Sequence, residues 1–240
     1  MPEILLRALL LLCAVLAANT RAGEPVAYTV PVAPWTFPDD PAHGVASEYL
    51  RYLFNGAQVP MQFGTLPYAR VINGLRDGSN VASMLIPDAE RDTFALRLCE
   101  VTTIRSGLLY KKERFGTLTP AALPGLTIGF QRGTHALDKL DKTPAIKSYT
   151  LRTVEQGLKM LKQDHLDATF LSSPGSDILL RTNGLAAADY GWLEVDVAPV
   201  VIYISRKAAL AQDEAALQRL RVVCDGQARA LMGQLMKKYH

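Results

Sequence analysis

The chain has 240 residues, with 26 Lys and Arg against 23 Asp and Glu, and its formal net charge at pH 7 is +3. Because basic and acidic residues are nearly balanced, the chain lacks the excess of positive charge that is typical of proteins that bind nucleic acid. We therefore expect no nucleic-acid partner. The length is enough for one large domain or for two domains of about 100 residues each.

Residues 1–22 have the pattern of a secretory signal peptide. Arg7 precedes an apolar stretch from Ala8 to Ala18, and small residues stand near position 22. The apolar stretch is shorter than the roughly 20 residues that a membrane-spanning helix needs. We therefore expect export to the periplasm with cleavage after Ala22, although cleavage after Ala17 fits the pattern as well.

Two of the three cysteines, Cys99 and Cys224, remain after removal of residues 1–22. In an oxidising compartment they could form a disulfide that stabilises the fold by roughly 2–4 kcal/mol. They could equally be two buried free thiols. Because their separation in the folded chain does not follow from the sequence, both alternatives stay open.

Strand-like and helix-like patterns alternate in the first part of the chain. Apolar residues spaced three and four apart predict helices that begin at Val45 and Pro67, and Asp88 is placed to cap a third. Residues 34–41 are too rich in proline for regular structure, so Trp35 is expected on a loop. Strands are predicted at 27–32, 59–63 and 81–86.

After a long predicted strand at 101–110 the same alternation restarts. Gly133 is expected to open one helix, and Thr153 with Gln156 three residues later forms a capping-box pattern at the start of another. The composition of residues 213–239 predicts terminal helices. Further strands are predicted at 126–130, 146–150, 167–171 and 195–204.

Two successive strand-and-helix units predict an α/β protein of two lobes, each built on a mostly parallel sheet flanked by helices. The first lobe is expected to begin with residues 23–100, and the second to comprise residues 101–198. A second long strand followed by helices indicates that residues 199–240 return to the first lobe.

Signatures of metal binding and catalysis are missing from the sequence. The four histidines, at positions 43, 135, 165 and 240, have no metal-ligand spacing. The chain has no Gly-x-Ser-x-Gly elbow and no phosphate-binding loop. The sequence therefore predicts no metal, no cofactor, no catalytic residue and no enzymatic activity.

Two positions could bind an anionic group. Arg91 follows a predicted strand at the edge where α/β sheets bind ligands, and arginine can bind a carboxylate with two hydrogen bonds. A solvated salt bridge from Arg91 to Glu90 or Asp92 is the alternative. Gly133 and Thr134 lie at the start of a predicted helix, which could bind an anion or could simply be an ordinary helix cap.

The order and the residues of several segments resemble those of the family 3 extracellular solute-binding proteins, which have the two-lobed type II periplasmic-binding-protein fold. The resemblance covers nearly all of the chain after residue 22. The matching stretches are Leu66-Pro67-Tyr68-Ala69-Arg70 with Gly74-Leu75 and Gly78, residues 83–91, residues 123–129 with Gly133-Thr134, and Gly157-Leu158 through Leu161 to Asp167-Ala168.

This resemblance implies two lobes that are joined by two extended strands and close on a small polar ligand. Such a protein would act as a monomer and deliver its ligand to the membrane permease of a polar amino acid ABC importer. Arg91 matches the family's carboxylate-binding arginine, and Thr134, next to Gly133, its partner in the other lobe. The remaining candidate ligand-binding residues are Trp35, Tyr68, Ser83 and Ser172.

The sequence departs from the family pattern at two positions. Asp88 stands where a threonine usually precedes the arginine by three residues, and Ser172 stands where amino acid binders usually have an aspartate for the ligand ammonium. A carboxylate at position 88 would repel a ligand carboxylate unless it only caps the helix. The ligand is therefore expected to be a carboxylate-bearing compound such as an organic acid, a peptide-like compound or a modified amino acid.

Two alternative functions remain on the same scaffold. An enzyme of the dehydratase or peptidoglycan-lytic type would need Glu48, Glu90 or His135 with a tuned pKa in the cleft. A stand-alone sensor would bind its ligand and dock on a receptor.

Overall fold

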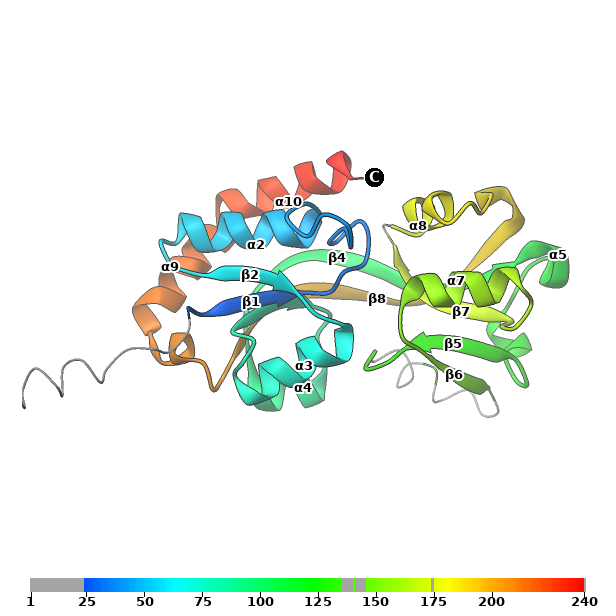
Figure 1. Cartoon of the computed structure of the whole chain (residues 1–240), viewed down its shortest axis with the longest axis horizontal. Helices are drawn as coiled ribbons and strands as arrows, with labels where there is room; N and C mark the ends of the chain where they lie inside the picture. The colour runs from blue at the N-terminus through cyan, green and yellow to red at the C-terminus, as the bar shows by residue number, and fades with distance from the viewer. Residues whose placement is uncertain (1–23, 135–139, 141–145, 174, 240) are drawn as a thin grey trace, which may run out of the picture.

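The structure is a computed structural model, and it describes residues 24–134, 140, 146–173 and 175–239. The predicted signal peptide and most of the helix predicted after Gly133 lie outside these residues. One eight-stranded sheet runs through the molecule in the order β2-β1-β3-β8-β4-β7-β5-β6. Figure 1 shows that the elements form two lobes, between which β4 and β8 extend.

Lobe 1 is built on three parallel strands. Its strands are β1 (Val26–Thr29), β2 (Gln62–Thr65) and β3 (Ala82–Leu85). Figure 1 shows α2, α9 and α10 on one face of these strands and α3 and α4 on the other. The helices are α2 (Val45–Gly56), α3 (Tyr68–Asp77), α4 (Ala89–Phe94), η3 (Ala209–Gln212), α9 (Glu214–Asp225) and α10 (Gln227–Lys238).

Lobe 2 repeats this plan with three more parallel strands. They are β5 (Thr127–Gln131), β6 (Lys147–Leu151) and β7 (Ala168–Ser173). The helices of this lobe are α5 (Lys112–Phe115), η1 (Pro120–Ala122), α7 (Val154–Lys162), α8 (Ser176–Thr182) and η2 (Ala187–Asp189). The predicted architecture of two lobes with mostly parallel sheets and flanking helices is thus confirmed.

Two long antiparallel strands, β4 (Ala95–Lys111) and β8 (Tyr190–Ser205), belong to both lobes. They stay paired from Ala95 opposite Ser205 to Lys111 opposite Tyr190. β4 pairs with β7 of lobe 2, and β8 pairs with β3 of lobe 1. The boundaries expected at residues 100/101 and 198/199 fall inside these two strands.

The helices form where apolar residues recur at helical spacing. In α2, the side chains of Tyr49, Leu50, Leu53 and Phe54 are completely buried in the core of lobe 1. α3 ends at Gly78, whose φ of 94° is in the left-handed region that favours glycine. These features follow the predicted helical periodicity and stop signal.

The capping box predicted at the start of α7 forms, but one of its two hydrogen bonds is shifted by one residue. Thr153 Oγ1 accepts a hydrogen bond of 3.2 Å from the Gln156 backbone N–H, as predicted. The Gln156 side chain reaches back to the backbone N–H of Arg152, at 2.8 Å, rather than to that of Thr153. Two backbone donors at this helix start are therefore satisfied by side chains.

Cys99 of β4 and Cys224 of α9 form a disulfide, with a Cα–Cα distance of 6.6 Å across a sequence separation of 125 residues. This decides between the two alternatives that the sequence left open. The bond lies in the core of lobe 1 and ties a helix near the C-terminus to one of the strands shared by the lobes. Within the described residues, no helix is long and apolar enough to cross a membrane.

Candidate functional site

A cavity of about 140 Å³ lies between the two lobes. Ile104 of β4 and Val200 of β8 line it where these strands pass from one lobe to the other. Its wall on the lobe 1 side comes from Thr29, Val30, Val32, Ala33, Trp35, Ala46, Tyr68, Met84, Leu85 and Ile86. The wall on the lobe 2 side comes from Gln131, Thr134, Val154, Phe170, Leu171, Ser172 and Leu179.

Apolar side chains form most of this wall, and none of the described residues that line the cavity is charged. The polar side-chain groups are uncharged: the hydroxyls of Thr29, Tyr68, Thr134 and Ser172, the amide of Gln131 and the indole N–H of Trp35. Such a site removes apolar surface from water and offers a few groups that can orient a ligand.

The lobes approach each other closely at two glycines of lobe 2. A Cβ atom added to Gly133 of lobe 2 would lie 3.3 Å from Cδ1 of Tyr68 in lobe 1. A Cβ atom added to Gly175 of lobe 2 would lie only 2.4 Å from Cδ of Pro34 in lobe 1. The two lobes are therefore already close together, and small residues permit their approach.

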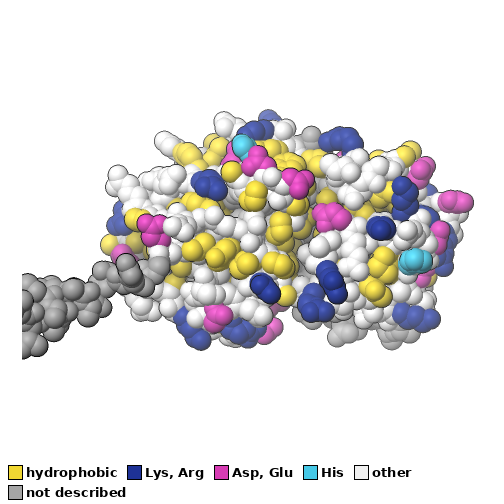
Figure 2. Space-filling view, viewed as in Figure 1, with side chains coloured by type: hydrophobic (Ala, Val, Ile, Leu, Met, Phe, Trp, Pro, Cys, Tyr) yellow, Lys and Arg dark blue, Asp and Glu magenta, His cyan; other side chains and the backbone are white. Residues whose placement is uncertain are grey.

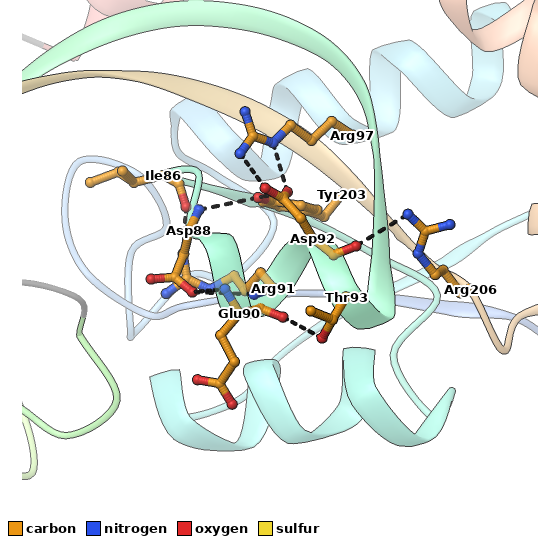
Figure 3. Close-up of polar contacts among 9 residues, drawn as sticks. All are labelled: Ile86, Asp88, Glu90, Arg91, Asp92, Thr93, Arg97, Tyr203 and Arg206. Atoms are coloured by element: carbon orange, nitrogen blue, oxygen red, sulfur yellow. Dashed lines mark hydrogen bonds and ion pairs between the residues drawn. The ribbon is translucent and has the colours of Figure 1, made fainter.

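Arg91 lies behind the cavity wall. The side chain of Asp88 caps α4 by accepting hydrogen bonds from the backbone N–H groups of Glu90 and Arg91, and Figure 3 shows these residues at the start of the helix. The Arg91 side chain is 4% exposed and does not line the cavity. Its Nη1 donates to the carbonyl oxygen of Ile86, and its Nη2 donates to the Tyr68 hydroxyl at 3.0 Å.

No described carboxylate neutralises the Arg91 guanidinium. Glu90 instead pairs with Arg76 at 2.6 Å, and Asp92 accepts from Nε of Arg97 at 2.7 Å (Figure 3). The Nε atom of Arg91 is buried and has no hydrogen-bond partner. A buried positive charge that lacks a counterion is costly, so an anionic group near this arginine would stabilise the site.

Tyr68 stands between Arg91 and the cavity. Burial raises the pKa of the Tyr68 phenol, and Asp88 raises it further, while the positive charge of Arg91 opposes the shift. The phenol therefore keeps its proton. Because its oxygen accepts from Arg91, the hydroxyl can still donate this proton to a second group.

Four of the predicted ligand-binding residues, Trp35, Tyr68, Thr134 and Ser172, line this one cavity. Gly133 lies at its edge, against Tyr68. Ser83 lies inside lobe 1, where its buried hydroxyl donates to the backbone carbonyl of Tyr28 at 2.7 Å. The structure thus brings together residues from both lobes, with Arg91 one layer behind them.

The apolar residues that form much of the cavity were not among the residues predicted from the sequence. Met84 is a neighbour of Ser83 in β3, and Phe170 precedes Ser172 by two residues in β7. Ile104 and Val200 come from the middles of β4 and β8. The alternation of side chains along a strand pairs Phe170 with Ser172 on one face, which is the signal that could have identified it.

Comparison with known proteins shows similarity of fold. No family model matches the sequence, and no curated protein matches it either. Solved structures do match. The substrate-binding protein of an amino acid ABC transporter has a TM-score of 0.76 and 16% identity, covering 90% of this chain and 99% of that one.

Two further structures show the range of similar proteins. A histidine kinase sensor domain with similarity to periplasmic binding proteins has a TM-score of 0.78 and 13% identity, covering 91% of this chain and 96% of that one. ArtJ, the arginine-, lysine-, histidine-binding protein of Geobacillus stearothermophilus, has a TM-score of 0.74 and 14% identity, covering 90% of this chain and 94% of that one.

The chain has the two-lobed periplasmic-binding-protein fold. The predicted resemblance is thereby confirmed at the level of the fold, and the cavity described above lies between the two lobes of that fold.

Proposed function

We propose that this protein is a periplasmic ligand-binding protein that closes its two lobes on a small carboxylate-bearing molecule. The observation that carries this proposal is the cavity whose walls come from both lobes and from both strands shared between them. A ligand there contacts both lobes only when they are together, so binding favours the closed arrangement.

Bending within β4 and β8 would let the lobes separate and admit the ligand. We place the lobe boundaries at residues 100/101 and 198/199, within these strands. Pairing of β4 with β8 has irregularities in register, including one between Glu100 and Thr102. Such irregularities weaken the ladder locally and suit a hinge.

A carboxylate in the cavity would accept a hydrogen bond from Tyr68, whose oxygen accepts in turn from Arg91, a cation without an ion-pair partner among the described residues. Thr134, Gly133 and Ser172 would hold the ligand from the lobe 2 side. Trp35 would pack against its body, and Ser83 would support the wall from within lobe 1.

Delivery to the membrane permease of an ABC importer is the role that the resemblance to family 3 solute-binding proteins favours, and we propose a monomer for it. A second role, ligand sensing for a receptor, is favoured by the similarity to a histidine kinase sensor domain. Both roles need the same cavity and the same closure.

Binding without chemical conversion fits the positions of the candidate acids. Glu48 accepts hydrogen bonds from Lys238 and Tyr239, outside the cavity. Glu90 is exposed and paired with Arg76. His135, the third candidate, lies outside the described residues. We therefore propose a binding protein rather than an enzyme.

Thermal unfolding of the mature protein with amino acids, organic acids, short peptides and sugars tests this function, since a ligand that binds the folded state raises its melting temperature. The proposal predicts a shift with organic acids, with the compound recovered unchanged.

Ser172→Phe, which fills the cavity, should remove the shift. The control Ser173→Phe changes the next residue of β7, which does not line the cavity, and should keep it. Chemical conversion of the compound would contradict the proposal. So would an equal loss of the shift in melting temperature in Ser172→Phe and Ser173→Phe.

A further inference from the structure

The described walls of the cavity between the lobes offer no counterion to a ligand ammonium group. None of the described residues lining it is an aspartate or a glutamate, so an ammonium group there would lose its water without gaining a counterion. That loss is large for a primary ammonium, which water solvates strongly. Ser172 lines the wall with a hydroxyl, which stabilises a cation far less than a carboxylate does.

The electrostatics of the surroundings favour an anion. Behind the lobe 1 wall, the buried Arg91 guanidinium bonds to Tyr68 and has no carboxylate partner among the described residues. This charge acts across a short, buried path, where water screens it weakly. An anionic oxygen at the Tyr68 hydroxyl would gain a hydrogen bond and the attraction of Arg91, while the opposing charge of Asp88, which also acts on this phenol, is engaged in capping α4.

Two exposed arginines stand where the lobes meet. Arg70 is in the first turn of α3, and Arg132 directly precedes Gly133. A Cβ atom at Gly133 would lie 3.4 Å from Cα of Ala69, so Arg70 and Arg132 are the chain neighbours of this contact between the lobes. Figure 2 shows Lys and Arg side chains in dark blue near this boundary, below the centre of the view. Such a cluster raises the local concentration of anions and their rate of entry.

The size and polarity of the interior favour an apolar body. At about 140 Å³ the cavity is comparable with apolar cavities of about 150 Å³ that take up a benzene ring. Trp35, Met84 and Phe170 offer flat or flexible apolar surface for such a group.

Resting on the proposed binding function, we infer that the ligand is an apolar monocarboxylic acid without an α-amino group, with its carboxylate at Tyr68 and its apolar group inside the cavity. A single ring or a branched aliphatic chain fits this description. An ordinary amino acid does not, because its ammonium would find no counterion among the described residues that line the cavity.

The test compares three compounds that differ at one group each, by isothermal titration calorimetry on the mature protein at pH 7.5. They are 3-phenylpropanoate, L-phenylalanine, which adds the α-amino group, and 3-phenylpropanamide, which removes the charge. The expected result is that 3-phenylpropanoate binds at least tenfold more tightly than either of the other two. 4-Methylpentanoate, L-leucine and 4-methylpentanamide form a second matched set with the same expected order.

Three results would overturn the inference. Equal or tighter binding of the amino acids would show that the cavity accepts an ammonium, and equal binding of the amides would show that the anion is not recognised. Binding of none of these compounds, while a polar amino acid still stabilises the protein, would overturn the inference and leave the proposed binding of a carboxylate standing. Stabilisation by no compound in the wider panel would overturn both.

The effect of Arg70 on ligand entry can be tested by association kinetics. Arg70→Gln should slow association of 3-phenylpropanoate about threefold or more at low salt, and this difference should shrink as salt is added. Lys207→Gln removes the same charge beside Gly78 at the other end of α3, so it should leave the association rate unchanged. Equal rates for the wild type and Arg70→Gln at low salt would contradict the role of this arginine.

Discussion

Arg91 donates a hydrogen bond of 3.0 Å from Nη2 to the hydroxyl oxygen of Tyr68, which links a buried positive charge to a residue that lines the cavity. The arginine itself does not reach the cavity, so its effect on a ligand passes through the tyrosine. This relationship gives Tyr68 a larger role than a cleft aromatic that only packs against the ligand.

Tyr68→Phe removes the hydroxyl and keeps the ring. We expect the affinity for 3-phenylpropanoate to fall about tenfold, since hydrogen bonds to charged groups contribute roughly 1.5–3 kcal/mol. The affinity for 3-phenylpropanamide should fall less, so the ratio of the affinities for the acid and the amide should become smaller. Calorimetric titrations of both compounds measure this.

A matched control removes a tyrosine hydroxyl elsewhere. Tyr52 donates to the side chain of Gln227 at 2.7 Å on the surface of lobe 1, and it does not line the cavity. Tyr52→Phe should bind both compounds as the wild type does. If Tyr68→Phe prefers 3-phenylpropanoate over 3-phenylpropanamide as strongly as the wild type does, the charge of Arg91 does not act on the ligand through the Tyr68 hydroxyl.

The pKa of Tyr68 gives a pH dependence with a definite sign. Because burial raises this pKa, the phenol remains a hydrogen-bond donor up to and beyond the usual range of tyrosine ionisation near pH 10. Affinity for 3-phenylpropanoate should therefore stay constant from pH 6 to pH 9. A decline that begins below pH 9 and is lost in Tyr68→Phe would show that the phenol ionises earlier.

Gly175→Ala should hinder closure of the lobes. Gly175 has a φ of 124°, and its added Cβ atom would lie 2.4 Å from Cδ of Pro34 in the other lobe. We expect weaker ligand binding and a larger radius of gyration by small-angle X-ray scattering in the presence of ligand. Gly184→Ala is the control, because Gly184 has a φ of 64° but open space around its Cβ position.

Both glycine variants should lose about 1–2 kcal/mol of stability through their positive φ. Only Gly175→Ala should also lose affinity. If both variants bind the ligand equally well, the contact between Gly175 and Pro34 has no part in closure.

Replacement of both cysteines by alanine should destabilise the fold. The disulfide closes a loop across a sequence separation of 125 residues, and its loss should cost roughly 2–4 kcal/mol of unfolding free energy. Urea unfolding of the Cys99→Ala/Cys224→Ala protein measures this loss. Ligand affinity should be retained, because neither cysteine lines the cavity. An unchanged urea midpoint would contradict a stabilising disulfide.

The contacts of Asp92 give a stability difference that depends on pH. Hydrogen bonds from Arg97 lower the pKa of Asp92, burial opposes this, and the hydroxyl of Tyr203, which donates at 2.9 Å, lowers it further (Figure 3). A carboxylate whose pKa is lowered on folding stabilises the fold above its unfolded pKa, and this stabilisation is lost as the pH falls through its folded pKa.

Asp92→Asn should therefore be less stable than the wild type at pH 7 by up to about 1 kcal/mol, as expected for a partly exposed ion pair. The two proteins should converge as the pH falls below 4. Asp39→Asn changes an exposed loop carboxylate and serves as the control. A stability gap in Asp92→Asn that grows on acidification would have the wrong sign.

The sequence predicted most elements because their patterns are local. The face of α2 with Tyr49 and Leu53 and the caps at Asp88 and Thr153 depend on neighbours within a few residues. It missed α8 (Ser176–Thr182), since so short a helix, with Ile178, Leu179 and Leu180 in a row, has no periodicity to detect. It also began β4 six residues late, at Val101 rather than Ala95.

The candidate site was predicted only in part. Trp35, Tyr68, Thr134 and Ser172 line one cavity, because the carboxyl ends of parallel strands and the loops beyond them gather at one edge of each lobe's sheet. The place of Arg91 behind Tyr68 depends on the packing of α3 against α4, which no local pattern records.

We claim that the ligand binds in the cavity between the lobes, and the fluorescence of Trp35 measures binding at that place. Trp35 lines the cavity and Trp192 does not, so Trp192→Phe leaves a single reporter at the site. Titration of this variant with 3-phenylpropanoate should give a saturable change in Trp35 emission, with the same dissociation constant as calorimetry. Calorimetric binding that leaves Trp35 emission unchanged would place the ligand elsewhere and contradict the claim.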